Sequence, residues 1–303
     1  MHILASGLQF PEGPIAMPDG SVILVEIARE TLTRIYPDGR VEVVAEMPGG
    51  PNGAAFGPDG RIYVCNNGGF SWIREAGTHR PAGQSATYSG GRIEAVDLTT
   101  GKIERLYSEC NGHPLRGPND IVFDRNGDFW FTDLGKRRDR DMDRGFVYWA
   151  KADGSGIREV IGPILTPNGI GLSPDEKMLY VAETETGRLW SFEIQGPGNI
   201  RKRPWPSPHG GTLVHGVGGY TRFDSLAVAS SGSICVAALH SAAVVEMTAD
   251  GKRAVHHPMP DIGVTNICFG GPDMRTAYVT LSHEGKLGMM DWHEPGLRLN
   301  FQR

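Results

Sequence analysis

The sequence predicts an all-β protein: a six-bladed β-propeller with four-stranded antiparallel blades, formed by residues 1–303 as a single domain. Three observations predict it. The 303 residues include 42 glycines and 21 prolines that recur along the chain, as expected for many short strands joined by turns. Six segments repeat one strand, turn and strand pattern. Successive repeats lie 40, 67, 49, 56 and 42 residues apart, close to the roughly 40 to 50 residues of a propeller blade.

Each repeat begins with a hairpin. A polar residue, called the anchor below, stands seven positions before a turn residue, as Glu12 does before Asp19 and Asn52 before Asp59. Only two strands and a tight turn of constant length would keep that offset in all six repeats. The six anchors are Glu12, Asn52, Asn119, Asn168, Asp224 and Asn266.

Third and fourth strands follow the hairpins. Apolar runs that start at glycine predict third strands at 91–101, 145–154, 187–194 and 285–292, and further runs predict fourth strands at 41–46, 103–108 and 157–162. The last repeat has little chain left for a fourth strand. We therefore expect His2 to Ser6 to supply it and to close the ring, which leaves no free sheet edge. A pair of β-sandwiches would not explain six copies.

Two long insertions separate the repeats, at 67–91 and 196–222. Both are rich in glycine and aromatic residues, and we expect them to form walls or lids over one end of the channel. Phe129 to Phe131 and Tyr63 fall on second strands, where they are expected to pack between blades.

Composition excludes several classes of function. The net charge of −5 and pI near 6.1 argue against a nucleic-acid or membrane partner, since both require a concentrated basic face. The run from Lys136 to Asp141 mixes basic and acidic residues, and we expect a solvated loop.

Four widely spaced cysteines indicate no disulfide framework or zinc knuckle. Without a signal-like N-terminus, a cytoplasmic location is expected; the oligomeric state is left open.

The anchors predict a cation site. Equivalent positions of propeller blades lie on a ring around the axis, so two carboxylates and four carboxamides converge there. Such oxygens suit one divalent cation, with Ca²⁺ expected and Mn²⁺, Mg²⁺ or Zn²⁺ as alternatives. The competing interpretation is that Asn52 and Asn168, each followed by glycine, are turn residues. Glu12 and Asp224 still need a partner, because a buried unpaired carboxylate is costly.

Two further polar residues lie near the anchors in the predicted blades. Asp120 is the only acid that directly follows an anchor, and we place it beside the substrate site, where it would orient Asn119. His240 ends a second strand, from which it could approach the channel; we expect instead a surface or satisfied core histidine.

The motifs "PEG" at 11–13, "RGPNDIVFD" at 116–124, "PNGIGLSPDEKMLYVAE" at 167–183 and "FDSLAV" at 223–228 together resemble the family of senescence marker protein, gluconolactonase and luciferin-regenerating enzyme. The resemblance covers essentially the whole chain. It implies a single metal ion, usually calcium, zinc or manganese, at one mouth of the channel. The implied ligands are Glu12, Asn168 and Asp224, with Asn119 as a further ligand or substrate contact, and Arg116 is implied to reach the substrate. Ser225 stands where the family commonly has glycine.

The resemblance further implies hydrolysis of a small-molecule lactone, or of an organophosphate as in a related branch. In the hypothesis favoured here, a cation polarises the lactone carbonyl. Asp224 either takes the proton of the attacking water as general base or attacks the carbonyl itself as nucleophile. Arg116, Asn52 and Asn266 would contact substrate oxygens or the residues and water around the metal ion. The rival hypothesis is a non-catalytic propeller in which calcium is structural.

Overall fold

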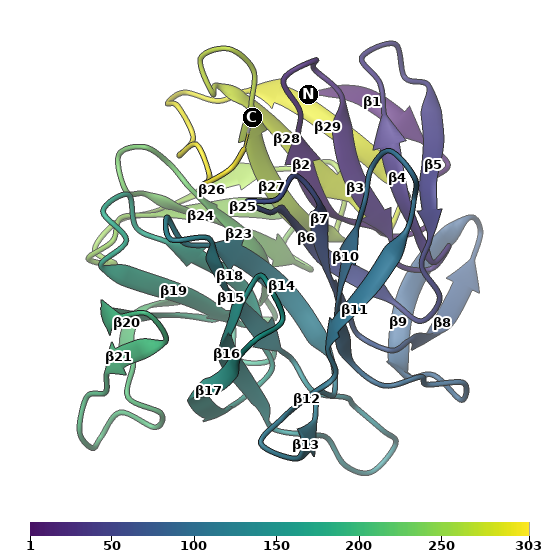
Figure 1. The fold of residues 1–303 in the computed structure, drawn as a ribbon. Helices are drawn as coiled ribbons and strands as arrows, with labels where there is room; N and C mark the ends of the chain where they lie inside the picture. Colours follow the sequence, from purple (N-terminus) through teal and green to yellow (C-terminus); the bar gives the residue numbers. More distant parts are fainter. Residues whose placement is uncertain (303) are drawn as a thin grey trace.

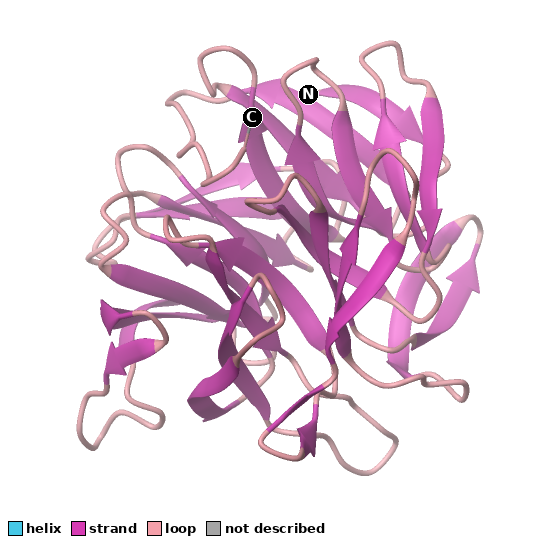
Figure 2. Ribbon diagram, viewed as in Figure 1, coloured by secondary structure: helices cyan, strands magenta, loops and turns pink. Residues whose placement is uncertain are grey.

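The computed structural model describes residues 1–302, which form strands, turns and loops without a helix (Figures 1 and 2). Consistent with this, the described residues contain no helix of the length and apolarity that a membrane span requires. Six small antiparallel sheets are arranged around a central channel as the blades of a propeller (Figure 1). The predicted fold class is confirmed.

The first three blades follow the chain in order. Blade 1 consists of β2 (Pro11–Ala16), β3 (Val22–Glu26), β4 (Thr31–Ile35) and β5 (Val41–Glu46). Blade 2 consists of β6 (Pro51–Phe56), β7 (Ile62–Asn66), β10 (Arg92–Val96) and β11 (Ile103–Tyr107). Blade 3 consists of β14 (Pro118–Phe123), β15 (Asp128–Asp133), β16 (Gly145–Lys151) and β17 (Ile157–Ile164).

The last three blades complete the ring. Blade 4 consists of β18 (Pro167–Leu172), β19 (Met178–Glu183), β20 (Arg188–Gly196) and a fourth position shared by β21 (Asn199–Arg201) and β22 (Thr212–Gly216). Blade 5 consists of β23 (Arg222–Val228), β24 (Ile234–Leu239), β25 (Ala243–Met247) and β26 (Ala254–Pro258). Blade 6 consists of β27 (Val264–Gly270), β28 (Thr276–Leu281), β29 (Lys286–Asp291) and β1 (His2–Ser6).

The N-terminal strand closes the ring as predicted. β1 pairs with β29, from His2 opposite Met289 to Ser6 opposite Lys286, so the purple start of the chain lies beside its yellow end (Figure 1). This pairing covers the outer edge of β29, which would otherwise be free to template aggregation.

The core lies between the blades because alternate side chains of a strand point to opposite faces. On β15, Phe129 and Phe131 pack with Tyr63 of blade 2, whereas Trp130 packs with Val181 and Trp190 of blade 4. The predicted packing role of these aromatics is confirmed. The four cysteines are free and three of them are buried, as expected without a disulfide framework.

Two short hairpins stand outside the blades. The insertion after β7 forms β8 (Phe70–Glu75) and β9 (Thr78–Gln84), and the loop after β11 forms β12 (Glu109–Cys110) and β13 (His113–Pro114). The first is important for the site described next.

Candidate functional site

The anchors lie at irregularities of the innermost strands. At Asn119 and Asp120, two residues of β14 lie opposite one residue of β15. The same bulge, with two residues opposite one, occurs at three other anchors: Asn52, Asn168 and Asp224. The strand register also shifts beside Glu12 and Asn266. A bulge bends a strand and changes the direction of its side chains. This local geometry directs most of the anchors into the mouth of the channel.

Five anchors line one open cavity of about 380 Å³. They are Glu12, Asn52, Asn119, Asn168 and Asp224, and all five are buried. The sixth, Asn266, does not line this cavity; its Nδ2 donates a hydrogen bond of 2.8 Å to Glu12 Oε2. The predicted convergence therefore holds for five residues. Asn266 lies outside the cavity and orients Glu12 through this hydrogen bond.

The glycines after Asn52 and Asn168 do not form turns. Both pairs lie within strands β6 and β18, where a Cβ on Gly53 would come within 2.4 Å of the Asn119 carbonyl oxygen and one on Gly169 within 2.6 Å of the Asp224 carbonyl oxygen. Glycine is required because neighbouring innermost strands approach each other closely. The turn interpretation of Asn52 and Asn168 is therefore wrong.

The electrostatics of the cavity favour a bound cation. Burial raises the pKa of Glu12, and burial together with the charge of Glu12 raises the pKa of Asp224 well above its ordinary value. Among the described residues, Asn119 Oδ1 is buried without a hydrogen-bond partner. Two converging carboxylates and an unpaired amide oxygen are a costly arrangement in the absence of positive charge. This donor set fits a hard divalent cation.

Asn168 is oriented by its neighbours. Its Nδ2 donates to Thr184 Oγ1 at 3.1 Å, and its Oδ1 accepts a long hydrogen bond of 3.4 Å from Ser225 Oγ. A hydrogen bond from Asn168 also lowers the pKa of Asp224, against the larger opposing effects of burial and of the charge of Glu12. The serine that replaces the family's common glycine thus helps to hold an anchor.

Asp120 faces away from the mouth. Its Oδ1 accepts from the Ile121 amide at 2.9 Å and its Oδ2 from the Ile170 amide at 3.3 Å, which ties β14 to β18. It lines a separate, largely apolar cavity of about 80 Å³ deeper in the channel, together with Asn266. Burial, followed by the charge of Glu12, raises the pKa of Asp120 to about 7. The structure does not bring it to the cavity that the five anchors line.

Arg116 also lies outside the cavity. Asp133 accepts hydrogen bonds from the amides of Arg116 and Gly117, both at 2.7 Å, and this fixed turn leaves the Arg116 side chain exposed. The side chain lines a surface depression with His113, Asp143 and others. Its expected contact with substrate has no support in this geometry.

The insertion at 67–91 forms a wall as predicted, since Phe70, His79, Arg80 and Pro81 line the cavity. The insertion at 196–222 instead contributes β21 and β22 to the outer edge of blade 4 and reaches the cavity at its end, through Tyr220 and Arg222. The β8–β9 hairpin is held across the ring, because the His79 amide donates to the His283 carbonyl of blade 6 at 3.3 Å and the Gln84 amide to the Arg137 carbonyl at 2.9 Å.

Lys136 is buried, so its interpretation as part of a solvated loop is wrong. Its Nζ donates to Asn67 Oδ1 at 2.8 Å and to the Gly69 carbonyl at 3.0 Å, and it lies 4.1 Å from the centre of the Phe70 ring. Burial lowers its pKa to about 7, against the opposing effect of nearby Asp133 and Asp143. Lys136 therefore fastens the base of the β8–β9 hairpin at the cavity wall.

We expect Lys136→Met to loosen this hairpin. Asn67 Oδ1 and the Gly69 carbonyl would each lose the charged donor and keep a backbone one, the amides of Gly69 and Ser85 respectively. We expect the loss of the two charge-assisted hydrogen bonds to cost about 1–3 kcal/mol in the free energy of unfolding. Amide hydrogen exchange in β8 and β9 should accelerate, while exchange in the blades stays slow. The matched control is Lys102→Met, at an exposed position. Unchanged exchange in β8 and β9 would contradict the fastening role.

Sequence reasoning missed a second group of cavity residues. These follow the second strand of a blade: Ile27, Leu134, Lys136, Thr184, Glu185, His240 and His283. His240 was expected at the surface or in the core, but it lines the cavity and stacks on Tyr220, with ring centres 4.9 Å apart. A usable signal existed, because the second strand of an antiparallel hairpin ends where the first begins. Loops after second strands must therefore share the mouth with the anchors.

Comparisons with known proteins agree with this architecture. Residues 10–283 match the profile of a family described as the SMP-30/gluconolactonase/LRE-like region. A protein named lactonase drp35 from Staphylococcus haemolyticus is 29% identical over 239 residues, covering 78% of this chain and 65% of that protein. A gluconolactonase from Zymomonas mobilis is 25% identical over 221 residues, covering 65% of this chain and 56% of that protein.

A solved structure shares the fold. The crystal structure of regucalcin, a calcium-binding protein from Agrobacterium tumefaciens, superposes with a TM-score of 0.74 at 20% identity, covering 98% of this chain and 97% of that one.

Proposed function

The chain belongs to the SMP-30/gluconolactonase/LRE-like family, and from that premise we propose that it is a metal-dependent hydrolase that opens the ring of a lactone. The observation that carries the proposal is the set of buried oxygen donors at the mouth of the channel, which includes the unpartnered Asn119 Oδ1. Relatives named lactonase and gluconolactonase support the choice of substrate class.

The residues that would hold the cation are Glu12, Asn168 and Asp224, with Asn119 as a fourth donor. Ca²⁺ is the proposed ion because all four side chains offer oxygen, and the regucalcin structure is described as that of a calcium-binding protein. When bound, such a cation supplies positive charge that polarises a carbonyl oxygen and stabilises the negative charge that develops on it.

The chain's own residues would handle the proton. Asp224 is a buried carboxylate that lines the cavity, where it can accept a proton from water. In the proposed step Asp224 takes a proton from water as the oxygen of that water bonds to the carbonyl carbon. The ring carbon–oxygen bond then breaks, and the ring oxygen receives a proton. One lactone and one water give one hydroxy acid.

The cavity walls would position the substrate and limit access by water. Asn52 and Asn119 can donate amide hydrogens to substrate oxygens, and Phe70, Pro81 and Tyr220 give the walls an apolar part. The proposal leaves Arg222 a structural role, because it is paired with Glu185 at 2.8 Å.

The test is a substrate panel with defined metals. The protein is stripped with chelator and assayed on aldonolactones, simple lactones and phosphotriesters, with Ca²⁺, Mn²⁺, Mg²⁺ or Zn²⁺ added singly. We expect ring opening of lactones only when a cation is added. The reaction is monitored by the acid that is released and by NMR of the hydroxy acid. Full turnover by the stripped protein would exclude metal dependence. If only phosphotriesters were hydrolysed, the proposed substrate would be a phosphotriester and not a lactone.

A further inference from the structure

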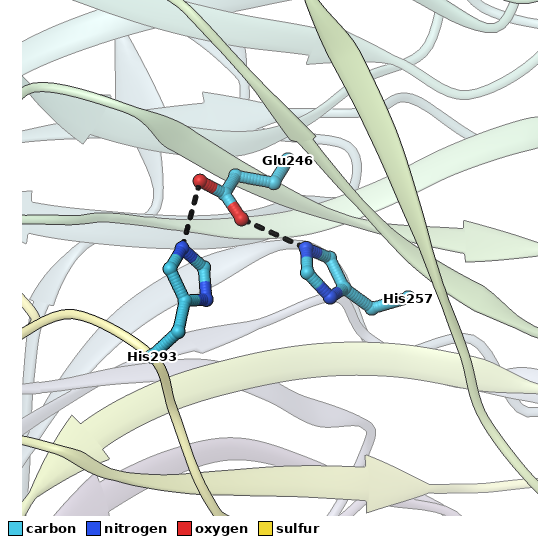
Figure 3. Close-up of side chains that lie close together, drawn as sticks. All are labelled: Glu246, His257 and His293. Carbon is cyan, nitrogen blue, oxygen red and sulfur yellow. Dashed lines mark hydrogen bonds and ion pairs between the residues drawn. The ribbon is translucent and has the colours of Figure 1, made fainter.

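A second cluster of metal-ligand residues lies away from the channel mouth, between blades 5 and 6. Glu246 comes from β25, His257 from β26, and His293 from the segment that follows β29. Both histidines turn a ring nitrogen toward the same carboxylate (Figure 3). His257 Nε2 lies 2.8 Å from Glu246 Oε2, and His293 Nε2 lies 3.3 Å from Glu246 Oε1.

The spacing of these atoms suits a small cation. One ligand atom from each of the three residues lies within 4.8 Å of the others. In a tetrahedral zinc site, with bonds of about 2.0–2.2 Å, neighbouring ligand atoms are roughly 3.3–3.5 Å apart. Small rotations of the two imidazoles and the carboxylate would therefore create the site without movement of the backbone.

The two histidines are held in place by packing. Their rings lie nearly parallel, 14° apart with centroids separated by 5.6 Å. Buried Trp292 packs against both, with ring centroids at 4.5 Å from His257 and 5.5 Å from His293. Arg275 Nη1 donates to the His293 carbonyl at 2.6 Å, which fixes the backbone of that segment. His257 is 25% exposed and would lose little side-chain entropy when an ion binds, whereas His293 is 54% exposed and would be ordered by the ion.

The local charges also suit a divalent ion. Glu294 Oε1 lies 3.8 Å from His293 Nε2, so a second carboxylate stands next to the cluster, where it can supply a fourth ligand. Two imidazoles and one carboxylate form a nitrogen-rich set that favours borderline metals such as Zn²⁺ over Ca²⁺. The chemistry therefore differs from that of the oxygen-lined mouth.

We propose that Glu246, His257 and His293 bind one transition-metal ion of the Zn²⁺ class, and that this ion cross-links blade 5 to blade 6. Blade 6 is the one completed by the N-terminal strand, so such an ion would hold the ring together next to its closure. The inference is independent of the proposed hydrolysis, because it uses none of the residues at the mouth.

The test is a Zn²⁺ titration by calorimetry of the chelator-stripped full chain, with excess Ca²⁺ present to occupy an oxygen site. We expect the wild-type protein to bind one more equivalent of Zn²⁺ than the double variant His257→Ala with His293→Ala. The matched control is His256→Ala, an exposed histidine that is the neighbour of His257 on the same strand, and it should bind as the wild type does. Co²⁺ should give a visible absorption band in the wild type and the control only.

A second variant guards against misfolding of the first. Glu246→Gln keeps the size of the side chain and one hydrogen-bond acceptor but removes the anionic ligand, and we expect it to weaken Zn²⁺ binding at least about tenfold. Saturating Zn²⁺ should raise the Tm of the wild type by roughly 3–8 °C and leave that of Glu246→Gln nearly unchanged. Equal Zn²⁺ stoichiometry in the wild type and the double variant, or equal affinity in Glu246→Gln, would overturn the proposal.

Discussion

Replacing Asp224 by Asn is expected to lower kcat/KM for lactone hydrolysis by about 10³-fold or more, since a positioned general base contributes about 10²–10⁴-fold and a cation ligand is weakened as well. The fold should survive. Asn has nearly the same shape, and the substitution removes one of two buried carboxylates that repel each other. The metal-free variant should therefore melt no lower than the metal-free wild type.

Two measurements on Asp224→Asn, the rate of hydrolysis and the melting temperature, separate the roles of Asp224. Hydrolysis is followed at increasing Ca²⁺, because a residue that acts only as a ligand can be compensated by more cation, whereas a missing base cannot. Asp250→Asn is the matched control, in an exposed turn of the same blade, and it should retain full activity. Wild-type rates in Asp224→Asn would remove Asp224 from the mechanism. A large fall in the melting temperature without loss of activity would indicate a structural ion.

The regular parts of the molecule were predictable because they depend on local spacing. The seven-residue offset reflects two strands and a turn, and the structure forms each hairpin at that spacing. Closure by His2–Ser6 followed from the missing fourth strand of the last repeat, and β1 does pair with β29. The convergence of the anchors followed in turn from propeller geometry, because equivalent positions of the blades must lie on one ring.

The remaining features depend on contacts between distant segments. Lys136 looks like one charge in a mixed run, but it is buried because Asn67 and Gly69, more than 60 residues earlier, accept its hydrogen bonds. Arg116 stands beside an anchor motif, yet the carboxylate of Asp133 fixes its turn and directs it outward. In both cases the decisive partner is not identified by any local pattern.

The cluster of Glu246, His257 and His293 shows the same limit. Its members are separated by 11 and 36 residues, a spacing that matches no metal motif, because they belong to two blades and are brought together only by the closed ring.

Removal of the cation from the mouth should destabilise the protein, and more strongly at higher pH. Burial raises the pKa of both Glu12 and Asp224 above their unfolded values. Between the unfolded and folded pKa values the folded, metal-free protein binds more protons than the unfolded chain, so its stability falls as the pH rises through that window. A bound cation offsets this loss by balancing the two carboxylates, and protons compete with it at low pH.

We therefore expect Ca²⁺ to raise the Tm by roughly 5–15 °C near pH 8, for a concentration about 100 to 1,000 times Kd, and by much less near pH 5. Differential scanning calorimetry with chelator or with Ca²⁺ at each pH measures both values. Asp224→Asn removes one of three buried carboxylates with raised pKa and leaves Glu12 and Asp120, so its metal-free Tm should depend less on pH than that of the wild type. If Ca²⁺ raised the Tm equally at the two pH values, the ion would not act by neutralising the buried carboxylates. If Ca²⁺ left the Tm unchanged at both pH values, the proposed cation site at the mouth would be wrong.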